Sequence, residues 1–259
     1  MKALITGASS GLGKDFAIKL SNLGYDLILV SRNKTNLKKV SKLCRTNVVI
    51  EDLDLSLEKN CKLLFNKYRG VDILINNAGF GLFGNFYETN LDKEINMIDL
   101  NVKAVHVLTK LYLKQMIKKD SGRILNVASS AAFLPGPLMS TYYSTKSYVF
   151  KLTAAIYEEL KQIKSNVKVS VLCPGPVDTN FNNVAKVSFS VKSLSSNYVT
   201  NYAIKKMFKN KLVIIPGVMS KIGAFCCKFA PLKLLLKIDY KIQKGKLKWK
   251  TKVLLLSSF

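Results

Sequence analysis

The chain has 259 residues, 48% of them hydrophobic, and a formal net charge of +25. This length and composition suit one α/β domain over residues 1–259. No stretch approaches the roughly 18 uninterrupted apolar residues of a membrane span, and the first apolar run is too short for a signal peptide, so we expect a cytoplasmic protein. The five cysteines show no metal-ligand spacing, which predicts free thiols and no metal site.

Strand-like runs alternate with helix-like runs along the chain, which is typical of a parallel sheet with helices on both faces. The expected strands are Lys2–Thr6, Asp26–Val30, Val48–Glu51, Ile73–Asn76, Gly122–Ala128, Lys168–Cys173 and Leu212–Ile215. Helices are expected to begin near Lys14, Thr35, Leu57, Leu91, Ser140 and Ser195. Right-handed crossovers then give a Rossmann-type, doubly wound sheet of about seven strands, with the ligand crevice at their carboxyl ends.

The longest expected helix covers Leu91–Lys118. Its apolar face is expected to carry Ile95, Ile98, Val102, Val105 and Leu108, which recur close to a 3.6-residue period.

A glycine-rich turn, Thr6-Gly7-Ala8-Ser9-Ser10-Gly11-Leu12-Gly13, joins the first strand to the first helix. A backbone without Cβ atoms lets a pyrophosphate approach closely, and the helix N-terminus adds unpaired N–H groups. The position of this turn therefore predicts a dinucleotide site. A tight turn without a ligand is the alternative.

The second strand runs into Ser31-Arg32-Asn33, where an NAD-specific fold of this type often has an acid. A guanidinium at this point can pair with a 2′-phosphate and stack on adenine. NADP(H) is therefore the preferred cofactor and NAD(H) the alternative. A solvated arginine with no ligand is the other interpretation of Arg32.

Three later strand ends carry small or polar residues that suit the same cofactor. Asp54-Leu55 can flank the adenine, and Asn76-Asn77-Ala78-Gly79 leaves room for the dinucleotide. For Asn77, bonding between strand ends is at least as good an interpretation as ligand contact. Pro174-Gly175-Pro176 is expected to line the nicotinamide side, with Thr179 bonding its carboxamide.

Tyr142 and Lys146 are four residues apart, so they share one face of a helix. A free phenol has a pKa near 10, and a neighbouring ammonium is expected to lower that pKa. Such a tyrosine can donate a proton during reduction or accept one during oxidation. Ser129, at the end of the fifth expected strand, can hold the substrate oxygen by a hydrogen bond. Asn101 can position a water beside Lys146, or alternatively serve as a helix-kink or core amide.

This ordered set of motifs over about residues 1–185 resembles the short-chain dehydrogenase/reductase family. The resemblance implies Tyr142 as acid/base, Lys146 on the ribose hydroxyls, Ser129 on the substrate and Asn101 in a proton relay. It also implies a homodimer or homotetramer. The residues expected to contact the cofactor are Gly7, Ser9, Ser10, Gly11, Leu12, Gly13, Arg32, Asp54, Leu55, Asn77, Ala78, Gly79, Tyr142, Lys146, Pro174, Gly175, Val177 and Thr179.

The function expected is an oxidoreductase that reduces a ketone or aldehyde to an alcohol, reversibly, with NADPH. A non-catalytic dinucleotide-binding regulator and a membrane-surface reductase of lipid or acyl substrates are the alternatives. No motif in the sequence identifies the small-molecule substrate. The loop after Thr179 and the tail are the segments expected to shape its pocket.

Residues 218–259 form a basic-apolar tail that we expect to be helical. From Lys192 to Lys252 the chain has 15 lysines and one acid, Asp239. A lid or an oligomer interface with snorkelling lysines is the favoured role of the tail, and contact with an anionic bilayer is the alternative. We expect no nucleic-acid partner, because the chain shows no aromatic–basic platform or known binding motif.

Overall fold

The computed structural model describes residues 1–179 and 193–256, with side chains described up to residue 245. Residues 180–192, which were expected to help shape the pocket, lie outside this part. Seven parallel strands form the central sheet in the order β3-β2-β1-β4-β5-β6-β9, which confirms the predicted Rossmann-type fold. The strands are β1 (Lys2–Thr6), β2 (Asp26–Ser31), β3 (Val48–Asp52), β4 (Ile73–Asn76), β5 (Arg123–Val127), β6 (Lys168–Leu172) and β9 (Val213–Ile214). A separate two-stranded sheet pairs β7 (Val177–Asp178) with β8 (Leu194–Ser195).

The central strands are almost wholly apolar because the sheet is covered on both faces. In β1, Ala3, Leu4 and Ile5 are completely buried. Ala3 pairs with Leu27 of β2 on one side and with Ile73 of β4 on the other. The first strand of the chain therefore lies inside the sheet, and the chain reverses its direction of winding between β3 and β4.

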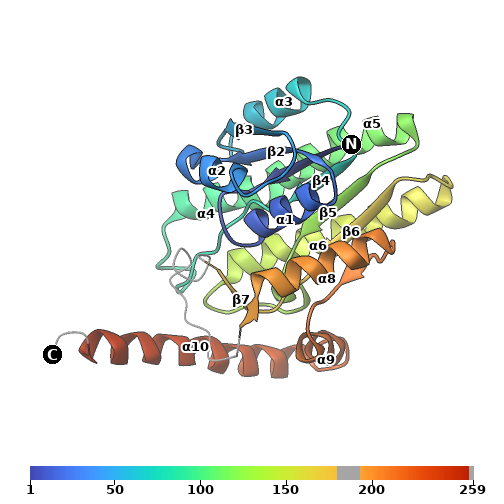
Figure 1. The fold of residues 1–259 in the computed structure, drawn as a ribbon. Coiled ribbons are helices and arrows are strands. Elements are labelled where there is room, and N and C mark those ends of the chain that lie inside the picture. Colours follow the sequence, from blue (N-terminus) through green and yellow to red (C-terminus); the bar gives the residue numbers. More distant parts are fainter. Residues whose placement is uncertain (180–192, 257–259) are drawn as a thin grey trace.

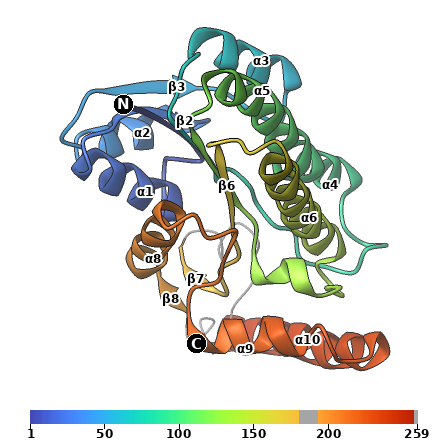
Figure 2. The ribbon, with the colours of Figure 1, turned by 90° about the vertical axis from the view of Figure 1, so that its right-hand side faces the viewer.

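Helices cover the two faces of the sheet in separate sets (Figures 1 and 2). On one face are α1 (Gly11–Asn22), α2 (Lys34–Ser41) and α8 (Ser196–Phe208). On the other are α3 (Glu58–Lys67), α4 (Leu91–Ile98), α5 (Val105–Lys119) and α6 (Ser140–Gln162). Each set contributes its own hydrophobic core against the sheet.

The expected helix over Leu91–Lys118 is present, but its apolar residues do not follow one regular 3.6-residue period, since Ile95 and Ile98 are exposed. A π-helical turn, η1 (Asp99–Ala104), separates α4 from α5. A π-turn holds more residues than an α-turn, so the inward-facing positions move along the sequence across it. Met97 and Asn101 are buried on one side of this shift and Val105 on the other, while Ile95 and Ile98 are exposed.

The tail forms two helices, α9 (Val218–Cys226) and α10 (Leu232–Leu256), after the last strand of the sheet. Both views show them as one layer along the lower edge of the molecule (Figures 1 and 2). No helix in the described residues is long and apolar enough to cross a membrane.

Candidate active site

A cavity of ≈ 460 Å³ opens at the carboxyl ends of the central strands. This volume is within the range of small-molecule sites in proteins. Eighteen of the twenty residues predicted for the site line it, the exceptions being Gly13 and Asn101. The lining residues among the predicted ones are Gly7, Ser9, Ser10, Gly11, Leu12, Arg32, Asp54, Leu55, Asn77, Ala78, Gly79, Ser129, Tyr142, Lys146, Pro174, Gly175, Val177 and Thr179.

The glycine turn forms a cradle at the N-terminus of α1. Gly7 and Gly11 have φ of +65° and +52°, a region that favours glycine. A Cβ on Gly7 would lie 2.9 Å from the Ala78 Cα, and one on Gly11 would lie 3.1 Å from the Thr179 side chain. Ser10, the N-cap, makes no side-chain capping bond, so the first N–H groups of α1 remain available to an anion at this end of the cavity.

Gly13 does not line the cavity, although it was predicted to contact the cofactor. It lies behind the turn, where a Cβ would come within 2.1 Å of the Gly7 carbonyl oxygen. Its role is close packing of α1 against the turn, because no side chain fits between the two backbones.

Asn77 ties the ends of β1 and β4 together. Its Nδ2 donates to the carbonyl oxygens of Thr6 at 3.0 Å and Gly7 at 3.2 Å. The Thr6 hydroxyl accepts from the backbone N–H groups of both Asn77 and Ala78 at 2.9 Å. The Asn77 side chain therefore bonds the two strand ends together, as the structural alternative predicts, while the residue also lines the cavity.

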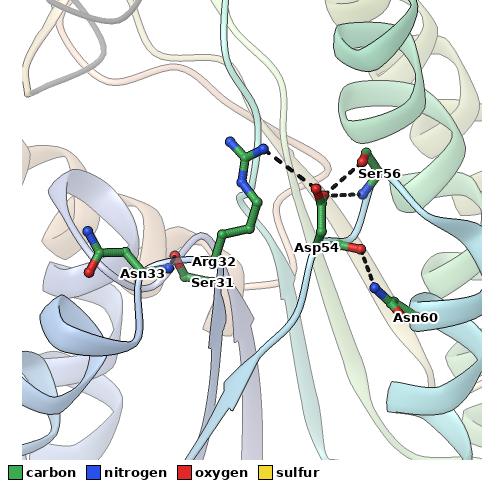
Figure 3. Close-up of polar contacts among 6 residues, drawn as sticks. All are labelled: Ser31, Arg32, Asn33, Asp54, Ser56 and Asn60. Atoms are coloured by element: carbon green, nitrogen blue, oxygen red, sulfur yellow. Dashed lines mark hydrogen bonds and ion pairs between the residues drawn. The ribbon is translucent and has the colours of Figure 1, made fainter.

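Arg32 and Asp54 form an ion pair at one end of the cavity (Figure 3). The Arg32 Nη1 lies 3.6 Å from the Asp54 Oδ2, and the Arg32 side chain is 60% exposed. Burial alone would raise the pKa of Asp54, but hydrogen bonds from Ser56 and the charge of Arg32 outweigh it and hold that pKa below its ordinary value. Beside this pair, the Ser31 hydroxyl donates to the Ser9 hydroxyl at 2.8 Å.

Tyr142 and Lys146 lie on adjacent turns of α6, beside the end of β5. The phenol of Tyr142 shares a hydrogen bond with the Ser129 hydroxyl. The Lys146 Nζ donates to the Val127 carbonyl oxygen at 3.0 Å and lies 5.8 Å from the centre of the Tyr142 ring. The three predicted catalytic side chains of this group therefore meet in one part of the cavity.

The expected lowering of the Tyr142 pKa is not what the protein alone produces. Burial raises the pKa of Tyr142 to about 12, and the hydrogen bond with Ser129 only partly offsets this. Burial also lowers the pKa of Lys146 to about 8. Desolvation disfavours both charged forms, and it is the largest cause of both shifts.

Asn101 lies behind the cavity wall, in the π-turn η1. Its Oδ1 accepts from the Phe80 N–H at 3.1 Å, and its Nδ2 donates to the Phe80 carbonyl oxygen at 2.9 Å and to the Thr145 hydroxyl at 3.2 Å. A Cβ on Gly79 would approach both the Asn101 Oδ1 and the Lys146 Nζ. Asn101 is thus close to Lys146, but its amide holds the loop that follows β4, as the core-amide alternative states.

Sequence reasoning missed several residues at the substrate end of the cavity. Tyr143 lines it beside Tyr142, and Asp239, Ile242 and Gln243 reach it from α10. The Gln243 Nε2 donates to the Tyr143 hydroxyl at 2.6 Å, across 100 residues of sequence. The expected lid role of the tail indicated this region, and the isolated acid Asp239 among the lysines was the signal that could have identified a residue in it.

A family model described as short chain dehydrogenase matches residues 1–187. An uncharacterized oxidoreductase of Staphylococcus epidermidis is 32% identical over 181 residues, which is 68% of this chain and 78% of the relative. Dehydrogenase/reductase SDR family member 7 of Mus musculus is 31% identical over 226 residues, which is 83% of this chain and 67% of the relative.

Solved structures share the fold over most of the length of this chain. A short-chain dehydrogenase from Sphingobium yanoikuyae in complex with NADPH is 26% identical with a TM-score of 0.78, over 87% of this chain and 92% of that one. The bulky-bulky ketone specific alcohol dehydrogenase from Comamonas testosteroni is 25% identical with a TM-score of 0.75, over 89% of this chain and 94% of that one.

Proposed function

The chain belongs to the short-chain dehydrogenase family of NAD(P)-dependent oxidoreductases, and we propose that it is an NADPH-preferring carbonyl reductase. The observation that carries this proposal is the meeting of Ser129, Tyr142 and Lys146 in the same cavity as the glycine cradle. One end of the cavity suits a dinucleotide, and the other carries the groups that proton transfer to a carbonyl oxygen requires.

The residues of the cavity fit a dinucleotide. The bare backbone of Gly7 and Gly11 and the N-terminus of α1 would hold the pyrophosphate. Asp54 and Leu55 would flank the adenine, and Lys146 would reach the ribose hydroxyls. Pro174, Gly175, Val177 and Thr179 would line the nicotinamide side. When bound there, the reduced nicotinamide supplies a hydride to the carbonyl carbon.

The preference for NADPH is supported by the end of β2. Ser31 and Arg32 stand where an acid would bind the 2′-hydroxyl of NAD. The Ser9 and Ser31 hydroxyls, together with the exposed guanidinium of Arg32, offer hydrogen-bond donors to a 2′-phosphate. NADPH in the Sphingobium relative supports the same choice.

Tyr142 is suited to act as the acid of the reduction. A buried phenol with a pKa of about 12 is protonated at neutral pH, so it can deliver its proton to the carbonyl oxygen. The Ser129 hydroxyl, already bonded to Tyr142, would donate to the same oxygen. The nearby Lys146 ammonium would stabilise the phenolate that proton transfer leaves behind.

The test is NADPH oxidation by the purified protein with a panel of ketones and aldehydes. Tyr142→Phe should abolish turnover and retain NADPH binding, measured by calorimetry, while Tyr148→Phe on the same helix should leave both unchanged. Turnover that survives in Tyr142→Phe would contradict the mechanism. Cofactor binding without turnover of any carbonyl compound in the wild type would instead favour a dinucleotide-binding regulator.

A further inference from the structure

The single acid of the tail points into the cavity. Fifteen lysines from Lys192 to Lys252 surround Asp239 in the sequence. An acid in such a segment is expected on the surface, where it can pair with lysines and water. Asp239 is instead 6% exposed and lines the cavity, together with Gln243 one turn later, which is 1% exposed.

Asp239, Gln243 and Tyr143 form a polar cluster next to the reacting end of the cavity. The Gln243 Nε2 donates to the Tyr143 hydroxyl at 2.6 Å and to the Asp239 Oδ1 at 3.4 Å. The rings of Tyr143 and Tyr142 meet edge to face with centres 6.1 Å apart. Gly136 leaves room for the Tyr143 ring, since a Cβ there would lie 2.2 Å from it. The cluster is therefore held one side chain away from Tyr142.

A role that only holds α10 in place would not explain why residue 239 is an aspartate. Moving an ionised group out of water is costly, and neutral side chains hold a helix without that cost. Among the residues that the structure describes, Arg32, Asp54 and Lys146 are the other charged groups that line the cavity, and all three lie among the residues assigned to the cofactor. Asp239 is thus the charged group that the tail adds at the substrate end.

Building on the proposed function, we propose that Asp239 determines substrate specificity. It selects carbonyl compounds that carry a hydrogen-bond donor, a hydroxyl or an ammonium group, on the part remote from the carbonyl. It rejects compounds that carry a carboxylate at the same place, because two like charges would then be buried together. Gln243 and Tyr143 act as positioning residues that fix the carboxylate.

The experiment compares four cyclohexanones that carry a hydroxyl, ammonium, methyl or carboxylate group opposite the carbonyl. We expect wild-type kcat/KM to favour the two donors over the methyl compound by about tenfold or more, and to be lowest for the carboxylate. Asp239→Asn should remove the preference for ammonium and relieve the rejection of carboxylate, and Asp239→Glu should retain both. Asp92→Asn, on the exposed surface of α4, is the matched control.

Calorimetric binding of the same four compounds in the presence of NADP⁺ separates this inference from the proposed function. If no ketone is turned over, the reductase proposal fails, but the order of affinities still decides the role of Asp239. An unchanged order in Asp239→Asn overturns the inference. An equal loss of affinity for all four compounds also overturns the inference, because a residue that only holds α10 in place would affect all four alike.

The outward side of the tail carries a second, independent observation. Leu234 and Ile238 lie one turn apart on α10, and α9 presents Ile222 and Phe225. All four are between 48% and 62% exposed. Exposed lysines accompany this apolar surface at Lys221, Lys228, Lys233, Lys237, Lys241 and Lys244.

Large apolar side chains exposed in this number mark a surface that contacts something. The lysines beside them favour an anionic partner. Amphipathic helices that lie in the interface of a lipid bilayer combine apolar side chains with lysines in this way. We infer that the outer surface of α9 and α10 docks onto an anionic lipid bilayer and lies in its interface. The charge of the tail, ten lysines against one acid in residues 218–259, disfavours a second copy of the same surface.

Sedimentation with lipid vesicles tests this surface. The protein should sediment with phosphatidylcholine vesicles that contain phosphatidylglycerol, remain in solution with phosphatidylcholine alone, and dissociate at high salt. Ile222→Glu with Phe225→Glu, or Lys233→Glu with Lys237→Glu, should abolish sedimentation, whereas Ile163→Glu at the end of α6 should not. Protein that stays in solution with anionic vesicles overturns the inference, as does a dimer that these same substitutions dissociate.

Discussion

Lys146 and Val127 connect helix α6 to the end of strand β5, through a hydrogen bond of 3.0 Å from the Lys146 Nζ to the Val127 carbonyl oxygen. This bond holds the ammonium beside Tyr142 in a buried site. The same burial destabilises the charged form of Lys146, so this residue should leave a signature in the pH dependence of folding.

Replacement of Lys146 by Met should change how stability depends on pH. Burial lowers the pKa of Lys146 from its ordinary 10.5 to about 8. The penalty for the charged form is present in full below about pH 8 and disappears as pH rises toward 10.5, since the unfolded chain then binds more protons than the folded one. The free energy of unfolding of the wild type should therefore rise through this window, relative to Lys146→Met, by up to about 3 kcal/mol.

Urea denaturation across this pH window measures the effect, with Lys151→Met on the exposed side of α6 as control. The control should follow the wild type. If the free energy of unfolding of the wild type ran parallel to that of Lys146→Met across this pH range, burial would not lower the pKa of Lys146.

Arg32→Ala should shift the cofactor preference toward NADH. Loss of one charge-assisted contact with a 2′-phosphate should lower kcat/KM for NADPH by about tenfold, a moderate effect because the guanidinium is largely exposed, and leave that for NADH nearly unchanged. Asp54→Asn releases Arg32 from its ion pair and should act in the opposite direction. Lys38→Ala removes a neighbouring exposed charge as control, and an equal loss for both cofactors in Arg32→Ala would contradict the assignment.

Gly13→Ala should destabilise the protein and abolish dinucleotide binding together. The new methyl group would lie 2.1 Å from the Gly7 carbonyl oxygen, so either α1 or the glycine turn must move. Overpacking of this kind costs roughly 1–3 kcal/mol. Gly223→Ala, in α9 with open space around it, should instead be neutral or stabilise by up to about 1 kcal/mol. Thermal unfolding and NADPH calorimetry measure both effects, and normal binding by Gly13→Ala would refute the packing role.

Asn101→Ala should lower the free energy of unfolding by about 2 kcal/mol, because it leaves the Phe80 backbone groups without their amide partner. Turnover should fall as the loop after β4 loosens, with a rise in the KM for NADPH. Asn201→Ala on exposed α8 should change stability by less than about 0.5 kcal/mol. A loss of kcat with normal stability and normal KM would instead indicate that Asn101 acts mainly in proton transfer.

The strands of the central sheet were predictable because they are short apolar runs, whereas the two-residue strands β7 and β8 gave no such signal and were not predicted. Lys2–Thr6 and Ile73–Asn76 were predicted with the bounds that the structure has. The motifs at the carboxyl ends of these strands had to meet, since parallel strands end at one edge of the sheet. This is why most of the predicted site residues share one cavity.

The remaining features depend on contacts between distant segments. The amide of Asn101, inside the π-turn, bonds to the backbone of Phe80, a contact that no periodicity of the helix reveals. The pKa of Tyr142 depends on how deeply α6 is covered, and the sequence showed only the neighbouring charge. Gln243 meets Tyr143 only because α10 folds back over the cavity, which needs the whole sheet in place.

The central place of β1 has a consequence for synthesis on the ribosome. Its partner on one side, β2, follows within about thirty residues, but Ala3 meets Ile73 of β4 only after a much longer stretch has emerged. Until then the nascent chain presents an unpaired apolar strand edge, which favours self-association. Chaperone capture of the nascent chain during this interval should therefore raise the yield of native protein.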